Sequence, residues 1–196
     1  DITDAVRWGN ENIIAVAVSA RLDDEFGGIP PMSAGNWVLY GGIYRDVRLV
    51  LKKPVHIPFQ GSAEHEGGTF ITTPEIDHDH AIVEITTHIK NEENTERNIT
   101  LRQRIQDADN TTISEFSKRI LLPQKDAVAV SQSSPKILSP HLWSPESPYL
   151  YSVETTILDK DEVLDKVTSP LGFRWFYWNR EKGKLYLNDE QIRINE

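Results

Sequence analysis

The sequence predicts an all-β protein, most of it a sandwich of two packed β-sheets. From about residue 56 to residue 172, short runs rich in Val, Ile and Thr recur at regular spacing. The joints between these runs are polar or contain Pro and Gly, as the turns of a sheet protein do. With 196 residues, of which 38% are apolar and 26% charged, the chain has the composition of a globular protein of one or two domains.

Two strands are predicted before residue 54. Ile13 to Ser19 (IIAVAVS) is a continuous apolar run of β-branched and small residues, with the length of a strand buried on both faces. Tyr44 to Lys52 (YRDVRLVLK) alternates and places its aliphatic residues on one face. Residues 21–42 between them hold two Gly-Gly pairs and a Pro-Pro, which predict a long loop, and such loops are often functional.

Seven further runs predict the strands of an immunoglobulin-like sandwich. The runs are TFITT, AIVEITTHIK, ITLRQRIQ, TISEFSKRILL, AVAVSQ, LYSVETTILD and VLDKVTS. The third run is also compatible with a helix, because Leu101, Ile105 and Ala108 fall at positions i, i+4 and i+7. We favour a strand, since Ile99, Leu101, Gln103 and Ile105 alternate and the turn-prone DADN follows.

Residues 134–153 contain four prolines and are predicted to run extended along a sheet edge, because proline disrupts helices and central strands. Leu142, Trp143, Tyr149 and Tyr151 are expected to anchor this segment to the sandwich through their large buried area. Aromatic residues among prolines are also compatible with a ligand platform, but we favour the anchoring role.

The two ends of the sequence predict a longer natural protein. KLYLNDEQIRINE reads as a strand, a turn at Asn188-Asp189 and a second strand that stops almost as it begins. A strand edge of this kind usually pairs with more chain. The sequence begins with DITDAV and its only Met is Met32, so a start upstream is also expected.

Composition limits the partners. The chain has 21 basic and 30 acidic residues, a net charge of -9, which argues against nucleic acid. No apolar run approaches the roughly 18 residues of a membrane span. The absence of cysteine excludes disulfides, thiol nucleophiles and Cys-ligated zinc, and it leaves the bacterial periplasm and cytoplasm both open as locations.

Several short patterns suggest chemistry but have a plainer interpretation. His78-Asp79-His80 places two His on one side of a strand, as metal ligands would be, yet no third ligand is evident and an exposed turn is favoured. Glu64-His65-Glu66 is interpreted as a solvated loop. Asn-Glu pairs, which glycosidases use, are two-letter matches of little weight, and they occur at Asn10-Glu11, Asn91-Glu92 and Asn195-Glu196. We predict no self-contained catalytic set and no metal site in this sequence.

Three motifs in the chain occur in a recognisable order. They are YGGIYRDVRLV (Tyr40 to Val50), LWSPESPYLYSV (Leu142 to Val153), and GFRWF followed by KLYLNDEQIRI (Gly172 to Ile194). This order resembles family 2 glycoside hydrolases, most of all β-galactosidases. In that family the first motif closes a jelly-roll sugar-binding domain, the second lies late in the immunoglobulin-like domain and the third opens a catalytic TIM barrel.

The resemblance implies three parts. Residues 1–56 would be the C-terminal strands of the jelly roll, 57–171 the complete sandwich and 172–196 the hairpin that leads into the barrel. A TIM barrel takes roughly 250 residues. The family is retaining and needs two carboxyls about 5 to 5.5 Å apart, which it carries on barrel strands. We therefore predict that this stretch does not hydrolyse glycosides, and that its parent hydrolyses terminal β-D-galactosides, with β-glucuronides and β-mannosides as sibling substrates.

The resemblance also implies the site residues Asn36 and Trp37. Relatives carry an Asp at the position of Asn36 that touches galactose or a bound cation. An amide holds a cation less strongly but still contacts a sugar hydroxyl. No cofactor is expected in this stretch, a cation in the parent stays open, and residues 21–42 are expected to rim the sugar site. Arg45 and Asp46 are interpreted as partners in a local ion pair or interdomain hydrogen bonds rather than as sugar ligands.

The partners implied are the barrel and the remaining jelly roll of the same chain, with a β-galactoside as the parent's substrate. Exposed strand edges in residues 1–56 also predict self-association into a homo-oligomer. The alternative function is a free-standing carbohydrate-binding or adhesive sandwich.

Overall fold

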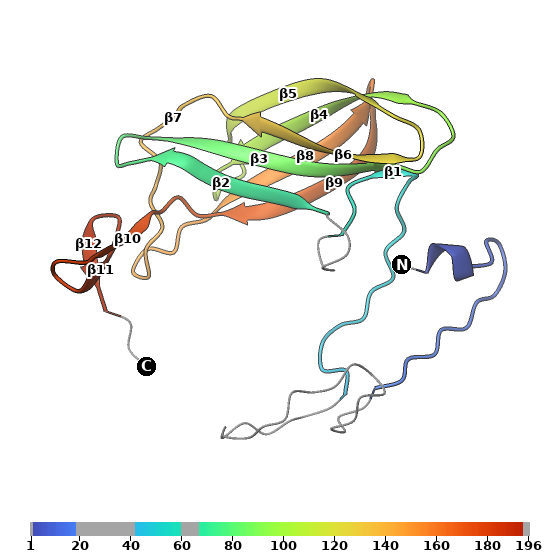
Figure 1. Ribbon diagram of the computed structural model, residues 1–196, viewed down its shortest axis with the longest axis horizontal. Helices are drawn as coiled ribbons and strands as arrows, with labels where there is room; N and C mark the ends of the chain where they lie inside the picture. The colour runs from blue at the N-terminus through green and yellow to red at the C-terminus, as the bar shows by residue number, and fades with distance from the viewer. Residues whose placement is uncertain (1, 19–41, 60–66, 194–196) are drawn as a thin grey trace. The chain divides into compact units, whose positions relative to one another are not determined.

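The computed structural model describes residues 2–18, 42–59 and 67–193 (Figure 1). The chain divides into two units, Asp1–Val50 and Leu51–Glu196. The elements are the 3-10 helix η1 (Thr3–Ala5) and the strands β1 (Val55–His56), β2 (Thr69–Ile76), β3 (His80–Asn91), β4 (Arg97–Gln106), β5 (Thr112–Leu122), β6 (Asp126–Ser133), β7 (Ile137–Leu138), β8 (Tyr151–Asp159), β9 (Glu162–Leu171), β10 (Phe176–Asn179), β11 (Lys184–Leu187) and β12 (Glu190–Ile192).

Two antiparallel sheets form the sandwich (Figure 1). In the first, β3 is central, with β1 and β2 along one side and β6 and β7 along the other. The second has the order β5-β4-β8-β9. Three strand positions thus face four, as in constant-type immunoglobulin domains. The predicted all-β sandwich is confirmed, and β4 settles the helix alternative in favour of the strand.

Strict alternation on the inner strands builds the core. In β3 every second residue from Ala81 to Asn91 is buried, and β4 repeats the pattern from Ile99 to Ile105. The core falls into two apolar clusters. One contains Ala81, Val83, Ile85, Ile105, Ile137, Tyr151, Val153, Leu171 and Phe173, and the other Val55, Ile57, Ile89, Ile99, Leu101, Leu122, Val130 and Ile157.

A row of buried polar residues separates the two clusters. Gln103 on β4 donates from its Nε2 to Thr87 Oγ1 of β3 at 3.1 Å, and its Oε1 accepts from Thr155 Oγ1 of β8 at 2.6 Å. All three side chains are at most 1% exposed. Because buried polar groups cost free energy unless they are paired, this row favours one alignment of β3 against β4 and β8.

The proline-containing segment and the turn at Asn188-Asp189 follow the sequence predictions. Ile137 and Leu138 form β7, which pairs with the start of β3 on the same side as β6. Leu142 and Tyr149 pack against the first apolar cluster. Asn188 and Asp189 both have positive φ, 48° and 67°, as a two-residue hairpin turn requires.

The two strands predicted before residue 54 differ from the structure. Over the described residues 2–18 and 42–54 no strand forms. Ile13 is 90% exposed and Tyr44 is 86% exposed. A strand is defined by its pairing, and these runs have no ladder partner in the described part of the chain, so their β-branched composition alone does not make a sheet. Their assignment to a jelly roll stays a prediction.

Candidate functional site

The predicted sugar-contacting residues lie outside the described part of the chain. Asn36, Trp37 and most of the loop at 21–42 fall in the undescribed range 19–41. Asp46 accepts a hydrogen bond from Arg48 at 3.3 Å, and the Arg45 guanidinium lies 5.3 Å from the Tyr44 ring centre. Both contacts are local: Asp46 makes its ion pair with Arg48, and Arg45 makes none among the described residues.

The patterns that suggested chemistry also resolve into structure. Asp77 Oδ1 accepts hydrogen bonds from the backbone N–H groups of Asp79 and His80, each at 2.8 Å, and holds the exposed turn between β2 and β3. These bonds lower the pKa of Asp77. Asn91 is buried and caps a turn by donating to the carbonyls of Thr95 and Pro123. Glu64-His65-Glu66 and Asn195-Glu196 lie outside the described residues.

What the structure does bring together is the second and third sequence motifs, at one end of the sandwich. Leu142 pairs with Phe173 in an isolated parallel bridge, and the Trp143 N–H donates to the Phe173 carbonyl at 2.8 Å. Phe173 is fully buried against Tyr151, with ring centres 4.8 Å apart. The second motif, which ends the proline-containing segment, therefore binds the start of the third motif at the point where the chain leaves the sandwich.

Asn188 ties this end of the sandwich to the hairpin. Its N–H donates to the Trp175 carbonyl at 3.0 Å and its Oδ1 accepts from the Trp175 N–H at 3.2 Å. Its Nδ2 donates to the Trp143 carbonyl at 3.0 Å. One side chain, only 8% exposed, thus joins three segments from two motifs. The sequence indicated Asn188 as a turn residue and carried no signal for these two further contacts.

The packing around Trp143 explains two more motif positions. A Cβ at Gly172 would lie 3.3 Å from the Trp143 Cβ, a contact tighter than side chains normally make. On the indole, the Arg174 guanidinium lies 4.4 Å from a ring centre, within the range of a cation–π contact. Gly172 and Arg174 therefore both pack against the side chain of Trp143, which anchors this part of the chain.

The approach to the sandwich is held by a second set of contacts, around Asp165 of β9. Asp165 Oδ2 accepts from Lys52 Nζ at 2.7 Å and from the Ile57 N–H at 2.8 Å. The side chains of Lys52 and Asp165 are only 18% and 12% exposed. Lys53 adds an ion pair with Glu162 and donates to the Val163 carbonyl at 3.0 Å. We call Lys52, Lys53, Asp165 and Glu162 the linker clamp.

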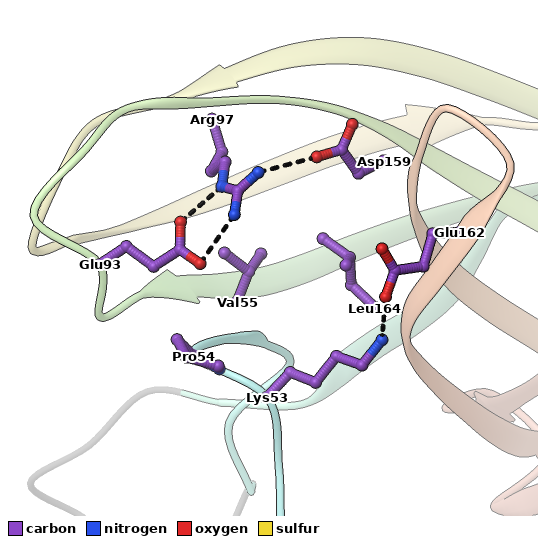
Figure 2. Close-up of a pocket in the computed structure, with 8 residues that line it drawn as sticks. All are labelled: Lys53, Pro54, Val55, Glu93, Arg97, Asp159, Glu162 and Leu164. Atoms are coloured by element: carbon purple, nitrogen blue, oxygen red, sulfur yellow. Dashed lines mark hydrogen bonds and ion pairs between the residues drawn. The ribbon is translucent and has the colours of Figure 1, made fainter.

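A pocket of about 210 Å³ lies beside the linker clamp (Figure 2). It is lined by Lys53, Pro54, Val55, Glu93, Arg97, Asp159, Glu162 and Leu164. Within it the Arg97 guanidinium pairs with both Glu93 and Asp159 (Figure 2). Its hydrogen bond lowers the pKa of Glu93, and the Lys53 ammonium lowers the pKa of Glu162.

Neither described pocket resembles a retaining glycosidase site. Such a site needs one protonated carboxyl and a second that is free to attack, whereas Glu93 and Glu162 are held ionised by basic partners. A second hollow of about 450 Å³ is open and has one carboxyl, Glu96, in its lining. Among the described residues no group of three or more His, Asp or Glu side chains is placed to hold a metal ion, and no helix could cross a membrane.

The match to known protein families covers this framework. The family model described as "Glycosyl hydrolases family 2" matches residues 68–174, from the approach to β2 to the residue after the buried Phe173. This match spans more than half of the chain. The chain belongs to glycosyl hydrolase family 2.

Relatives of this family 2 chain carry two names. It is 34% identical over 200 residues to a β-glucuronidase of Formosa agariphila, covering 100% of this chain and 20% of the relative. It is 31% identical over 196 residues to the β-galactosidase BoGH2A of Bacteroides ovatus, covering 100% of this chain and 21% of the relative. The chain thus spans about a fifth of the curated relatives it matches.

Solved structures agree on the fold of the family 2 chain. A Bacteroides uniformis β-glucuronidase 2, covalently bound to cyclophellitol-6-carboxylate aziridine, matches with a TM-score of 0.73 and 31% identity over 83% of this chain and 19% of that one. A putative β-galactosidase from Bacteroides fragilis matches with a TM-score of 0.77 over 97% of this chain and 28% of that one. The identity to the second is 23%, so it supports the fold alone.

Proposed function

We propose that this chain is a non-catalytic portion of a retaining β-glycosidase, and that its sandwich is a scaffold that fixes the course of the chain on both sides. The observation that carries the proposal is that side chains fix both the segment that enters the sandwich and the hairpin that follows it. The linker clamp holds residues 52–57 on β9, and Asn188 holds the hairpin on Trp143. Neither set of contacts resembles a substrate site.

The chemistry of these contacts supports the proposed scaffold role. An ion pair that is mostly withdrawn from water, or a buried side-chain amide with two hydrogen bonds, keeps one geometry far better than an exposed pair does. A catalytic domain reached through the hairpin and a sugar-binding domain reached through residues 52–57 would then each start from a fixed point. The loop at 21–42, with Asn36 and Trp37, would rim the sugar site from the side of the sugar-binding domain.

Two substrate classes are open for the parent enzyme. The sequence motifs favour a β-galactoside. The names of the first curated relative and of the B. uniformis structure favour a β-glucuronide, whose sugar carries a carboxylate. The loss of a charge at Asn36, where β-galactosidases carry Asp, is also easier to reconcile with an acidic sugar, because a carboxylate would repel an Asp at that position.

The experiment that decides the substrate is a panel of nitrophenyl glycosides offered to the product of the complete open reading frame. We expect hydrolysis of the β-galactoside or the β-glucuronide and of no α-glycoside. If no β-glycoside is cleaved and the reading frame ends near residue 196, the free-standing binding module becomes the better proposal.

A further inference from the structure

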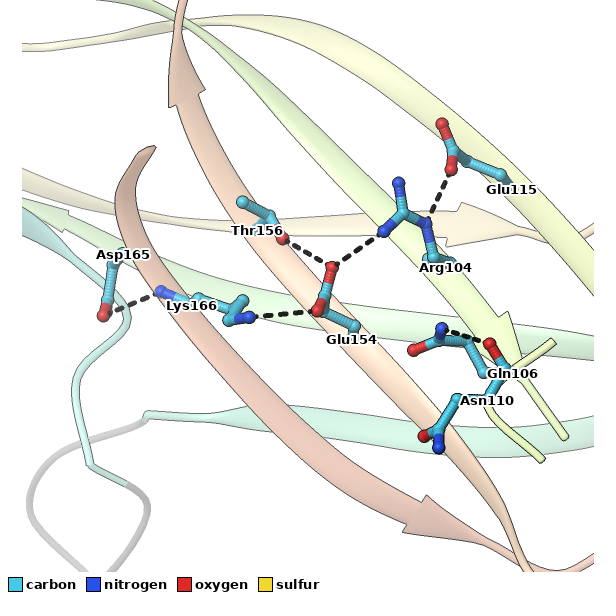
Figure 3. Close-up of polar contacts among 8 residues, drawn as sticks. All are labelled: Arg104, Gln106, Asn110, Glu115, Glu154, Thr156, Asp165 and Lys166. Atoms are coloured by element: carbon cyan, nitrogen blue, oxygen red, sulfur yellow. Dashed lines mark hydrogen bonds and ion pairs between the residues drawn. The ribbon is translucent and has the colours of Figure 1, made fainter. Parts of the chain in front are cut away.

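The outer face of the β5-β4-β8-β9 sheet carries a closed network of ion pairs. Arg104 donates from its Nε to Glu115 at 2.8 Å and from its Nη1 to Glu154 at 3.4 Å (Figure 3). Lys166 Nζ donates to the other oxygen of Glu154 at 3.2 Å (Figure 3). Two positive and two negative charges are thereby matched, and the network has no charge to spare.

Two more arginines lie on this face and outside the network. Arg102 on β4 stands opposite Ser117 of β5 and Thr156 of β8. Arg119 on β5 stands opposite Thr100 of β4. The two arginines are therefore diagonal neighbours across one strand pair, a spacing of about 7 to 8 Å. None of the residues that oppose them is charged.

Neither arginine has a side-chain partner in the part of the chain that the structure describes. Arg102 is half-buried, and its Nε is shielded from water with no hydrogen-bond partner. Arg119 is exposed. Two like charges at this diagonal spacing repel each other, and a buried donor without a partner costs free energy. In a chain with nine more acidic than basic residues, this uncompensated pair indicates that an external anion belongs here.

We propose that Arg102 and Arg119 bind carboxylates of an acidic polysaccharide. The planar guanidinium fork matches a carboxylate in a bidentate way. Neither arginine lines a described pocket, and an open sheet face suits an extended chain better than a small molecule. Nucleic acid is disfavoured, because its binding draws on many phosphate contacts and this face offers only two arginines outside the network. The choice of a polysaccharide as the ligand rests on the proposed glycosidase function. The binding of an anion by the two arginines does not rest on it.

Affinity electrophoresis of the 196-residue chain in gels that contain polygalacturonate tests the proposal, with neutral galactan gels in parallel. We expect retardation by polygalacturonate only, weakened by added salt. The double variant Arg102→Gln/Arg119→Gln should lose about tenfold or more in affinity, since each lost charged contact accounts for a large part of such binding. The control Arg180→Gln/Lys182→Gln removes the same charge from the exposed turn between β10 and β11 and should bind as the parent chain does.

The Arg102→Gln/Arg119→Gln variant should also unfold at the same temperature as the unmodified 196-residue chain or at a higher one, because it removes a repulsion. This measurement separates lost binding from lost folding. Equal retardation of both double variants, or equal retardation in galactan, would overturn the proposal. So would retardation by single-stranded DNA without any by polygalacturonate. None of these readouts depends on hydrolysis, so the site can fail while the glycosidase function stands, and the reverse.

Discussion

Asp165→Ala should loosen the linker clamp, and the size of the effect can be worked out from the contacts of this one carboxylate. It accepts from Lys52 Nζ at 2.7 Å and from the Ile57 N–H at 2.8 Å, with the charged pair mostly withdrawn from water. Removing it leaves a largely buried ammonium and a backbone donor unpaired. Hydrogen bonds to charged groups contribute about 1.5 to 3 kcal/mol, and breaking a fully buried pair costs about 3 to 5 kcal/mol.

Because Lys52 keeps some access to water, we expect Asp165→Ala to lower the free energy of unfolding by about 3 kcal/mol. Asp165→Asn keeps an acceptor for Ile57 and should lose about half as much, roughly 1.5 kcal/mol. In a domain of this size about 3 kcal/mol corresponds to a fall of about 6 to 12 °C in the unfolding temperature.

Thermal unfolding followed by tryptophan fluorescence and circular dichroism measures the effect. Glu162→Gln gives the comparison within the clamp, because the pair of Glu162 with Lys53 is largely exposed and its loss should move the transition far less than Asp165→Ala does. Equal transitions for Asp165→Ala and the parent chain would show that the clamp contributes nothing to stability, and the scaffold proposal would lose one of its two supports.

Three further predictions concern the hairpin, the core and the response to pH. Asn188→Ala removes the bond to the Trp143 carbonyl and the favourable positive φ, so increased hydrogen exchange of the β11–β12 amides is expected while the sandwich stays protected. Gln103→Leu should cost about 2 kcal/mol by leaving two buried threonines unpaired, and replacing both threonines by valine as well should restore most of it, as denaturant titration would show. The pKa of Glu93 is lowered in the folded state from 4.5, so its contribution is present above that value and is lost as pH falls through the folded pKa; Arg97→Gln should flatten this part of the stability-against-pH curve.

The strands that the sequence predicts are present in the structure where the chain also contains the strands that pair with them. β3 and β4 alternate cleanly, and each pairs with a strand next to it in the chain, β3 with β2 and β4 with β5, so local pattern and tertiary pairing agree. The run at Ile13 has a stronger apolar signal than most of these strands, yet it forms no strand in the structure. Apolar periodicity predicts that a segment will pair, and only the presence of a partner decides whether it does.

The contacts between the hairpin and the segment around Trp143 show what a sequence pattern does not predict. The motifs around Trp143 and Gly172 were visible as sequence patterns, and the turn at Asn188 followed from its preference for positive φ. Its bond to the Trp143 carbonyl, 45 residues away, was beyond reach, because an amide that joins distant backbone groups leaves no periodic signal. The same holds for Asp165, which the sequence shows as one acidic residue among thirty.

The most direct test of the non-catalytic role is to measure nitrophenyl β-glycoside hydrolysis by the 196-residue chain and by the product of the complete open reading frame, at equal molar concentration. We predict no release of nitrophenol above buffer by the chain and clear turnover of a β-galactoside or a β-glucuronide by the complete product. Turnover by the chain alone would contradict the non-catalytic role, and an inactive complete product would contradict the glycosidase parent.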